Sequence, residues 1–309
     1  MVNKLFPVTT YKVTEEYEGV RLDNCLISRI KGLPRTKIYS IIRKGEVRVN
    51  GSRSKPSRRL TEGDKIRIPP YSVNKKSTKK IQEQSKELLS KRFVFEDDSL
   101  IVIDKPVGIA SHGGSGISLG LIESLRQIKP KFKNAQLVHR LDKETSGCIL
   151  VALKRPILRK LHKELREGRV EKEYLTIVKG HWPSDLTKID LKLKKNQLRS
   201  GQREVKIEEE GKRSISHFEV IKKTKELSLL KCKILTGRTH QIRVHVNYAG
   251  HPILGDLKYG DKKFNEEMKE KGVNRMLLHS HSIKFPKLGL DFKVNKPGIF
   301  QELLKKSNE

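Results

Sequence analysis

The stretch VHRLDKETSG occupies residues 138–147 and leads directly into the apolar run CILVA at residues 148–152. A short apolar run that begins after a glycine is typical of a buried strand. Asp142 is therefore predicted on a loop that feeds a strand, and loops held by a rigid sheet often carry catalytic residues. Its neighbours Arg140 and Lys143 are cations, and an ionised, partly desolvated aspartate can act as a nucleophile or a general base. The competing interpretation is a turn or a surface ion pair, the commoner role of a lone aspartate.

The chain from residue 93 onwards contains more strand patterns than helix patterns. Helices are predicted at residues 154–167 and 239–249, where apolar residues recur with helical spacing and a glycine follows. Because crossover helices are too few for a parallel sheet, this part predicts an α+β fold with a mainly antiparallel mixed sheet. Its strands are expected at the β-rich runs 93–95, 100–103, 148–152, 174–178, 217–221 and 229–234.

The first 70 residues show a separate, smaller pattern. A short helix is predicted at residues 21–31, and a second begins at Pro34 and ends before Gly45. Alternating strands follow at residues 47–49 and 65–68. Basic side chains lie along the second helix and the first strand. We interpret them as an RNA-binding surface, and the alternative is a charged face that only contacts solvent. They include Arg35, Lys37, Arg43, Lys44 and Arg48.

A polar segment at residues 71–92 separates the two patterns. It is rich in Lys, Ser and Gln and almost free of aromatic residues, which is typical of a flexible linker. The predicted organisation is therefore a small basic domain at 1–70, a flexible basic linker at 71–92 and a larger domain at 93–309.

The net charge of +31 and the pI of about 10 indicate a polyanionic partner, either nucleic acid or an anionic membrane. No stretch approaches the ~20 apolar residues that span a bilayer, and residues 1–10 lack the apolar core of a signal peptide. Cys25, Cys148 and Cys232 are far apart and show neither a metal-like spacing nor a full set of pairs. The sequence therefore predicts a cytoplasmic, nucleic-acid-binding protein that uses no metal.

Two further polar clusters resemble the first in composition. One joins DKPVG at residues 104–108 to HGGSG at 112–116, whose glycines give weak evidence for a phosphate cradle. The other is TGRTHQIRVH at residues 236–245, and the segment HPILGD at 251–256 ends it. There Arg238 and Arg243 can bind phosphate, balance a carboxylate or form structural pairs, and the two histidines of 236–245 can equally be hydrogen-bonded core residues.

These motifs together resemble the RluA family of pseudouridine synthases. The matching segments are HRLD with TSG, the Lys105-Pro106-x-Gly108 motif with His112, Lys172-x-Tyr174, and TGRTHQIR at residues 236–243, all in the family's order. The N-terminal pattern resembles the S4 RNA-binding domain. Residues 43–50 and 112–116 are most similar to the RluC type of the family, which modifies large-subunit (23S) ribosomal RNA at more than one uridine.

The resemblance implies a pseudouridine synthase fold and a reaction without cofactors. We also expect a monomer, because the chain looks self-sufficient. Asp142 would be the catalytic carboxylate, Arg243 its cationic partner, and Tyr174 a stacking platform for the uracil, unless Tyr174 is only a core residue. Arg140 would fill the place of the flipped base. Leu277 and Leu278 would line the pocket or, as an equal alternative, pack in the core. Further contacts to RNA are expected from Lys105, His112, His139, Arg238 and His240. Two alternatives stay open at this point, namely transfer RNA as the substrate, or a non-catalytic ribosome-assembly protein.

Overall fold

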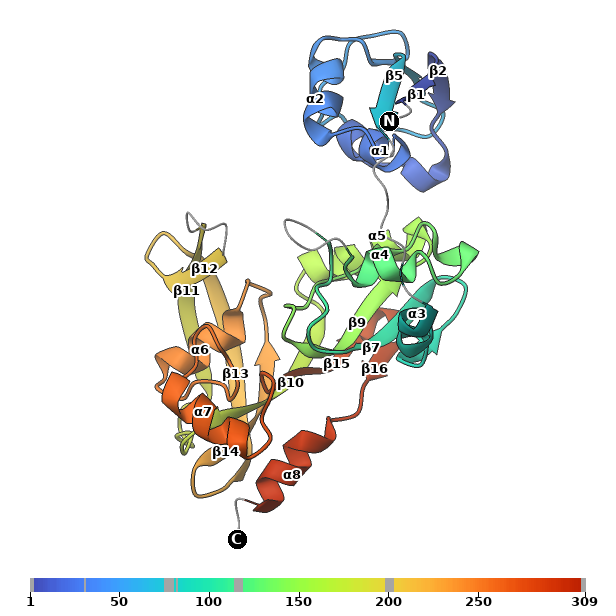
Figure 1. Ribbon diagram of the computed structural model, residues 1–309. Helices are drawn as coiled ribbons and strands as arrows, with labels where there is room; N and C mark the ends of the chain where they lie inside the picture. Colours follow the sequence, from blue (N-terminus) through green and yellow to red (C-terminus); the bar gives the residue numbers. More distant parts are fainter. Residues whose placement is uncertain are drawn as a thin grey trace. The chain divides into compact units, whose positions relative to one another are not determined.

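The computed structural model describes residues 3–30, 32–74, 81, 83–113, 119–197 and 203–306. Its contacts divide the chain into two compact units, Met1–Lys79 and Lys80–Glu309 (Figure 1). The glycines at 114 and 116, in the segment predicted as a weak phosphate cradle, lie outside the described residues.

The first unit packs two short helices against small sheets. Helices α1 (Leu22–Arg29) and α2 (Arg35–Arg43) bury their apolar faces beside the 3-10 helix η1 (Glu15–Tyr17). A three-stranded antiparallel sheet has the order β2 (Thr9–Lys12), β4 (Lys65–Ile68) and β3 (Arg48–Val49). The two predicted helices and both predicted strands are thus confirmed, and the unit has its own core.

In the predicted linker at 71–92, the described residues include a strand and a helix. Strand β5 (Tyr71–Asn74) pairs with β1 (Asn3–Phe6), and the rings of Phe6 and Tyr71 stack with centroids 4.8 Å apart. Helix α3 (Glu83–Ser90) belongs to the second unit, where Leu89 enters the core. The sequence of this segment looks polar because a two-stranded ribbon and a helix with one buried face bury few apolar residues.

The second unit is built on one 11-stranded sheet. Its main order is β12-β11-β13-β14-β10-β15-β9-β7-β6, with β16 beside β15 and β8 beside β9. The β9–β15 pair is parallel and the other pairs are antiparallel, so the predicted mixed, mainly antiparallel sheet is confirmed. The strands are β6 (Phe93–Glu96), β7 (Leu100–Lys105), β8 (Gln136–Leu137), β9 (Ser146–Ala152), β10 (Glu171–Lys179), β11 (Lys188–Gln197), β12 (Arg203–Ile207), β13 (Lys212–Lys223), β14 (Leu227–Ile234), β15 (Leu278–Phe285) and β16 (Leu290–Lys293).

Gly147 makes the parallel pairing of β9 with β15 in the middle of this sheet possible. Its φ of +106° is in the region that favours glycine, and a Cβ there would lie 2.1 Å from the carbonyl oxygen of Ser280 on β15. Only a residue without a side chain allows the two strands to approach so closely. This β9–β15 pairing holds the start of β9, and with it the preceding Asp142 loop, at the centre of the sheet.

Helices cover both faces of the sheet. The largest apolar cluster packs α4 (Leu121–Leu125) against β7, β9 and β10, and α5 (Arg155–Arg166) lies over a second cluster that includes the other face of β9. Helix α6 (Gln241–Tyr248) lies against β11 and β13, and α7 (Lys262–Glu270) and α8 (Gly298–Lys306) share a third cluster (Figure 1). The predicted helices at 154–167 and 239–249 are confirmed as α5 and α6. Short 3-10 turns complete the unit, η2 (Pro130–Phe132) and η3 (Pro286–Leu288).

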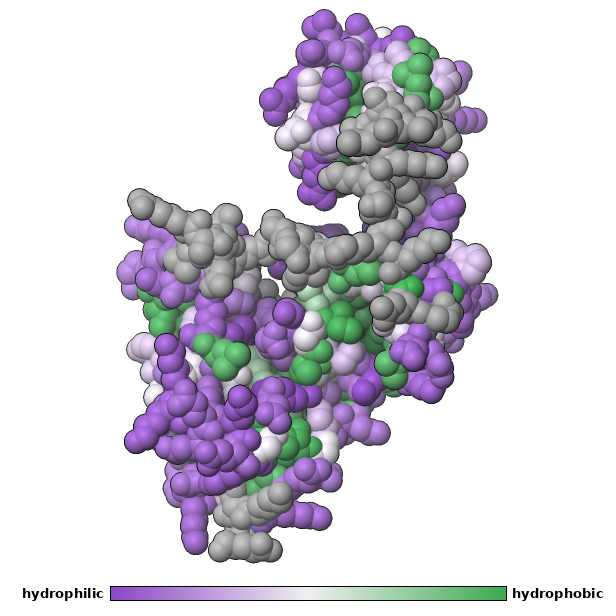
Figure 2. All heavy atoms as spheres, in the orientation of Figure 1, coloured by the Kyte–Doolittle hydropathy of each residue, from purple (hydrophilic) through white to green (hydrophobic). Residues whose placement is uncertain are grey.

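The surface agrees with the charged composition. Figure 2 shows that the visible face of each unit is mainly hydrophilic, with apolar side chains in small, scattered groups. Among the residues that the structure describes, no helix is both long and apolar enough to cross a membrane.

Candidate active site

An open pocket lies between the loop that precedes β9 and the turn that follows β14. Its empty volume, open mouth included, is about 450 Å³. One wall is polar and comes from the two motif loops, and the other is apolar and comes from strands β10 and β15. The lining residues are Arg140, Leu141, Asp142, Thr145, Tyr174, Ile234, Gly237, Arg238, His240, Gln241, Ile242, Arg243 and Leu278.

Asp142 faces two nitrogen-bearing side chains across this pocket. Its Oδ2 atom lies 3.6 Å from Nη1 of Arg243 and 3.9 Å from Nε2 of His240. The carboxylate keeps 29 % of its surface exposed, whereas the Arg243 side chain keeps only 7 %. A reachable carboxylate is thus held against a buried cation. The sequence neighbour Lys143 contacts Glu144, Arg140 lines the same pocket, and Arg243 lies beside Asp142, where the resemblance placed it.

Arg243 is fixed from behind by a second carboxylate, Asp256. The guanidinium donates from Nε to Oδ2 at 2.7 Å and from Nη2 to Oδ1 at 2.8 Å, a bidentate pair in which Asp256 is 1 % exposed. Burial alone raises the pKa of Asp256, but the hydrogen bonds and charge of Arg243 bring the pKa below its usual value. Backbone N–H groups of Lys258 and Tyr259 donate to the same carboxylate. Asp256 therefore stays charged and leaves Nη1 of Arg243 directed at Asp142.

The lysine of the KPxG motif holds the Asp142 loop through hydrogen bonds to backbone carbonyl groups. Lys105 is fully buried, and its Nζ donates to the carbonyls of Pro106, Ile109 and Lys143 at 2.8, 2.9 and 3.2 Å. Burial lowers the pKa of Lys105 to about 8, partly offset by nearby acidic groups including Glu144. Because the ammonium has no exposed surface, we assign Lys105 to holding this loop and not to contacting RNA.

A second clamp joins the same two loops. The hydroxyl of Ser111 donates to the Leu141 carbonyl at 2.7 Å and accepts from the Leu141 N–H at 3.0 Å, and Gly108 N donates to the Lys143 carbonyl at 2.9 Å. Leu141 and Lys143 flank Asp142. The backbone on both sides of the carboxylate is therefore pinned by residues 105–111.

Gln241 organises the turn that carries Arg238 and His240. Its side-chain oxygen accepts from the Thr236 hydroxyl at 2.8 Å and from the Arg238 N–H at 3.0 Å, while its amide donates to the Ile215 carbonyl at 2.9 Å. His240 adopts the left-handed region at φ 53° and ψ 21°, which is uncommon for a residue other than glycine. The buried glutamine thus holds the strained turn that directs the His240 ring towards Asp142.

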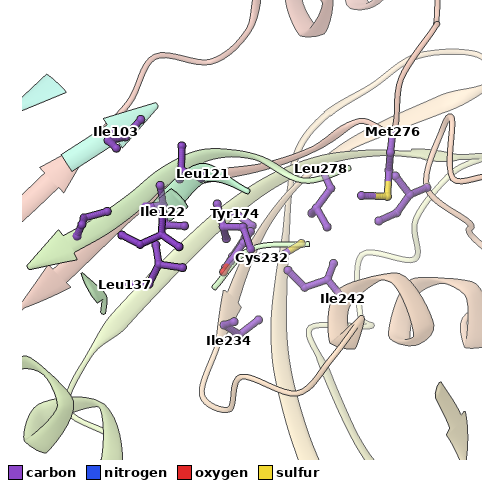
Figure 3. Close-up of a cluster of buried hydrophobic side chains, with 14 of the residues drawn as sticks. Ile103, Leu121, Ile122, Leu137, Tyr174, Cys232, Ile234, Ile242, Met276 and Leu278 are labelled. Atoms are coloured by element: carbon purple, nitrogen blue, oxygen red, sulfur yellow. The ribbon is translucent and has the colours of Figure 1, made fainter. Parts of the chain in front are cut away.

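Tyr174 and Leu278 form the apolar wall. Tyr174 on β10 is 8 % exposed and belongs to the main core cluster, where Figure 3 draws it near Ile122, Cys232 and Leu278. Burial raises the pKa of its hydroxyl, so the ring stays neutral. The ring belongs to the core, as one interpretation expected, and it also lines the pocket, so stacking on the uracil stays a prediction. Leu277 instead packs into the cluster with α7 and α8.

Several predicted contact residues lie apart from the pocket lining. His112 is half-exposed, 3.8 Å from Glu123, and His139 accepts a hydrogen bond from the Leu150 N–H through Nε2 at 3.2 Å. Arg140 and Arg238 do line the pocket. Arg43 and Lys44 are exposed on the first unit, and Arg48 is partly exposed there. His245 is buried with its Nε2 3.0 Å from the Ser214 hydroxyl, in agreement with the structural interpretation.

Sequence reasoning missed Asp256 and Tyr259. The available signal was the segment HPILGD at residues 251–256, which ends the third polar cluster. In the structure Tyr259 lies under the Arg243 guanidinium, 5.0 Å from ring centroid to Cζ, and its hydroxyl lies 2.8 Å from Nδ1 of His240. Among the described residues, no group of three or more His, Cys, Asp or Glu side chains is placed to hold a metal ion.

Comparison with known proteins agrees with this geometry. Residues 99–248 match the family model of RNA pseudouridylate synthase, and residues 20–66 match the S4 domain. Fold and pocket thus define an RNA pseudouridylate synthase catalytic domain joined to an S4 domain. The chain belongs to the RluA family of pseudouridine synthases.

The similar curated proteins cover nearly the whole chain. It is 47 % identical over 289 residues to the ribosomal large subunit pseudouridine synthase C of Pasteurella multocida, covering 92 % of this chain and 89 % of that protein. The protein of the same name from Escherichia coli K12 is 44 % identical over 291 residues, covering 92 % and 91 %. Among solved structures, human RNA pseudouridylate synthase domain containing 1 aligns with a TM-score of 0.56 and 28 % identity, covering 69 % of this chain and 85 % of that one.

Proposed function

We propose that this protein isomerises uridines of large-subunit (23S) ribosomal RNA to pseudouridine, at more than one site, with Asp142 as the catalytic carboxylate. One observation carries the assignment: Asp142 lies in the pocket 3.6 Å from the buried Arg243 and opposite the apolar wall of Tyr174 and Leu278. The substrate class follows from the relatives above, whose names state the large ribosomal subunit.

The reaction requires only rearrangement of bonds within one nucleotide. The bond from uracil N1 to ribose C1′ breaks, the base turns over, C5 bonds to C1′, the C5 proton leaves and N1 takes up a proton. Three first steps are compatible with a carboxylate in this place, namely attack on C1′, addition to uracil C6, or removal of a ribose proton. In each of them Arg243 stands beside the oxygen that acts.

The target uridine must leave its stack to reach Asp142, at a cost of a few kcal/mol. Stacking on the Tyr174 ring returns ~1–3 kcal/mol of this cost. Arg140 is exposed where it lines the pocket and is the candidate to occupy the space that the base vacates. Arg238 and His240, which also line the pocket, are candidates for polar contacts to the flipped nucleotide.

The first unit would supply sequence-independent affinity. Arg43, Lys44 and Arg48 present positive charge on a domain that matches the S4 model, and contacts from such residues to phosphates release counterions. We further propose that the protein acts as a monomer in the cytoplasm. The catalytic pocket is formed within one chain, and the three cysteines are buried as separate thiols, which suits a reducing compartment.

The central test compares Asp142→Asn with Glu144→Gln. Both changes remove one negative charge from the same loop, but the Glu144 side chain is 48 % exposed and contacts Lys143 rather than Arg243. We expect Asp142→Asn to abolish pseudouridine formation while leaving RNA binding nearly intact, and Glu144→Gln to keep the activity. Substantial isomerisation by Asp142→Asn would contradict the assignment.

The substrate is tested by mapping pseudouridines in cells that lack the protein. We expect specific pseudouridines to disappear from large-subunit ribosomal RNA and to return with the wild-type gene but not with Asp142→Asn. Loss from transfer RNA alone would assign the same chemistry to another substrate. Unchanged pseudouridine maps together with a defect in subunit assembly would favour a non-catalytic RNA-binding role.

A further inference from the structure

The hairpin formed by β11 and β12 packs directly onto Tyr259. Leu193 and Val205 of the hairpin are buried against Val244 of α6, and the Tyr259 ring packs on the same cluster. The backbone N–H of Val205 donates to the Tyr259 hydroxyl at 3.0 Å. The position of this hydroxyl is therefore set by a strand that lies at the edge of the sheet.

The same hydroxyl is shared with His240. The Tyr259 oxygen lies 2.8 Å from Nδ1 of His240. Because the backbone N–H of Val205 can only donate, the tyrosine oxygen accepts from it, and the single hydroxyl proton is available for Nδ1. Burial raises the pKa of Tyr259, which keeps that proton on the oxygen.

A histidine that accepts at Nδ1 carries its own proton at Nε2 when it is neutral. Burial lowers the pKa of His240 and Asp142 partly offsets this shift, so the neutral ring is favoured near pH 7. The Nε2 atom lies 3.9 Å from Oδ2 of Asp142. The left-handed backbone of His240 at φ 53° is the conformation that directs the ring this way.

We propose that Tyr259 is a positioning residue that fixes His240 as the Nε2–H tautomer, so that a neutral N–H donor faces the carboxylate of Asp142 beside the Arg243 cation. The hairpin sets the direction of the tyrosine proton, Tyr259 sets the tautomer, and His240 presents the donor. The inference rests on the proposed function in that it takes Asp142 as the catalytic group.

The tautomer is observable without any catalytic assay. In the full chain labelled with ¹⁵N-histidine, the His240 signals are assigned by their loss in His240→Gln. At pH 7.5 we expect an unprotonated Nδ1 and a protonated Nε2 in the wild type. In Tyr259→Phe, which keeps the ring and removes only the hydroxyl, we expect the Nδ1–H form to appear. A wild-type spectrum with a protonated Nδ1, whether as the other tautomer or as imidazolium, would overturn the inference.

Kinetics test whether the tautomer matters for Asp142. Tyr259→Phe should lower kcat by about twofold to tenfold, the effect of one hydrogen bond, with KM for ribosomal RNA unchanged. The matched control is Tyr248→Phe, which removes a hydroxyl at the exposed end of α6. We expect this variant to keep the wild-type kcat. In the double variant Tyr259→Phe/His240→Gln, kcat should equal that of His240→Gln alone, because Tyr259 acts through the imidazole.

Two results would overturn the coupling, namely wild-type kcat in Tyr259→Phe, or fully additive losses in the double variant. Thermal melting of each variant shows that it is folded. If Tyr259→Phe does not fold, the wild-type spectrum still decides the tautomer. Failure of the proposed function is separate, because it would appear as activity in Asp142→Asn whatever tautomer the spectrum reports.

Discussion

Arg243 places Nη1 3.6 Å from Oδ2 of Asp142, although the two residues are distant in the sequence and α6 carries one while a loop carries the other. The guanidinium cannot leave this position freely, because Asp256 holds Nε and Nη2. One arginine thus serves two carboxylates, a buried one that fixes its plane and a partly exposed one that is free to react.

Changing Asp256 to Asn should weaken both the fold and the chemistry. The variant keeps the shape but breaks the buried Arg243–Asp256 pair and leaves Arg243 only the more distant, partly exposed Asp142. Breaking a buried pair costs roughly 3–5 kcal/mol. We expect a fall of that order in the free energy of unfolding, measured with urea, and a lower kcat. Asp291→Asn is the control, because that side chain is 60 % exposed. Equal stability of the two variants would show that Asp256 does not hold Arg243.

The strands at 100–103 and 148–152 were predictable because their apolar runs are continuous, as expected for strands buried on both faces. The β9 run at residues 148–152 is an example, since the whole of Ser146–Ala152 is buried. The hairpin β11–β12 was missed although Ile189, Leu191 and Leu193 alternate with polar residues, because the high lysine content hides the period of two. Helix α7 was missed for a similar reason, as it buries only Phe264 and Met268.

The candidate site was predictable only where a motif carried it. Asp142, Tyr174 and Arg243 follow from their motifs, and the structure brings all three to one pocket. Asp256 and Tyr259 act through contacts between segments distant in the chain, and no local pattern marks such contacts. Lys105 was expected to contact RNA because it belongs to a motif. Its burial among three carbonyl groups depends on tertiary contacts, which the sequence pattern does not show.

Catalysis should depend more on the aromatic ring of Tyr174 than on its hydroxyl group. Tyr174→Phe keeps the stacking face and loses only the hydrogen bond with Ser280, so we expect kcat/KM within a few-fold of the wild type. Tyr174→Leu removes the stacking contact, worth ~1–3 kcal/mol, so kcat/KM should fall on the order of 10-fold or more. Steady-state kinetics on ribosomal RNA measure both, with thermal melting to separate folding from catalysis. An equal loss in the two variants would argue against stacking.

Two buried histidines, His245 and His279, and the half-buried His139 should make the fold sensitive to mild acid. Burial lowers the pKa of His139 and His279 to about 3 and that of His245 to about 4, whereas an unfolded histidine titrates near ~6.5. Because each folded pKa lies below the unfolded one, the unfolded chain binds more protons as the pH falls through 6.5, and stability is lost in that direction. Each group approaches a slope of roughly 1.4 kcal/mol per pH unit once the unfolded ring is fully protonated, well below pH 6.5.

Urea unfolding at pH 7.5, 6.5 and 5.5 measures this dependence. At pH 7.5 the histidine contribution is almost complete. For the three groups together, the free energy of unfolding should fall by about 1 kcal/mol between pH 7.5 and 6.5 and by about 3 kcal/mol between pH 6.5 and 5.5. NMR titration gives an independent check, since these three rings should not titrate above pH 5. A flat free energy of unfolding between pH 6.5 and 5.5 would show that the rings charge without penalty.

Replacing Arg43 and Lys44 by Ala should weaken RNA binding and its dependence on salt. Each lost phosphate contact lowers the slope of log K against log[salt] by about 0.7–0.9, so the double variant should lose roughly 1–2 from the slope. The control removes Lys269 and Lys305, exposed on α7 and α8 of the other unit. Because both double variants lose two charges, a difference between their slopes separates contact from general attraction. Identical slopes for both would remove this face of the S4 domain from the RNA interface.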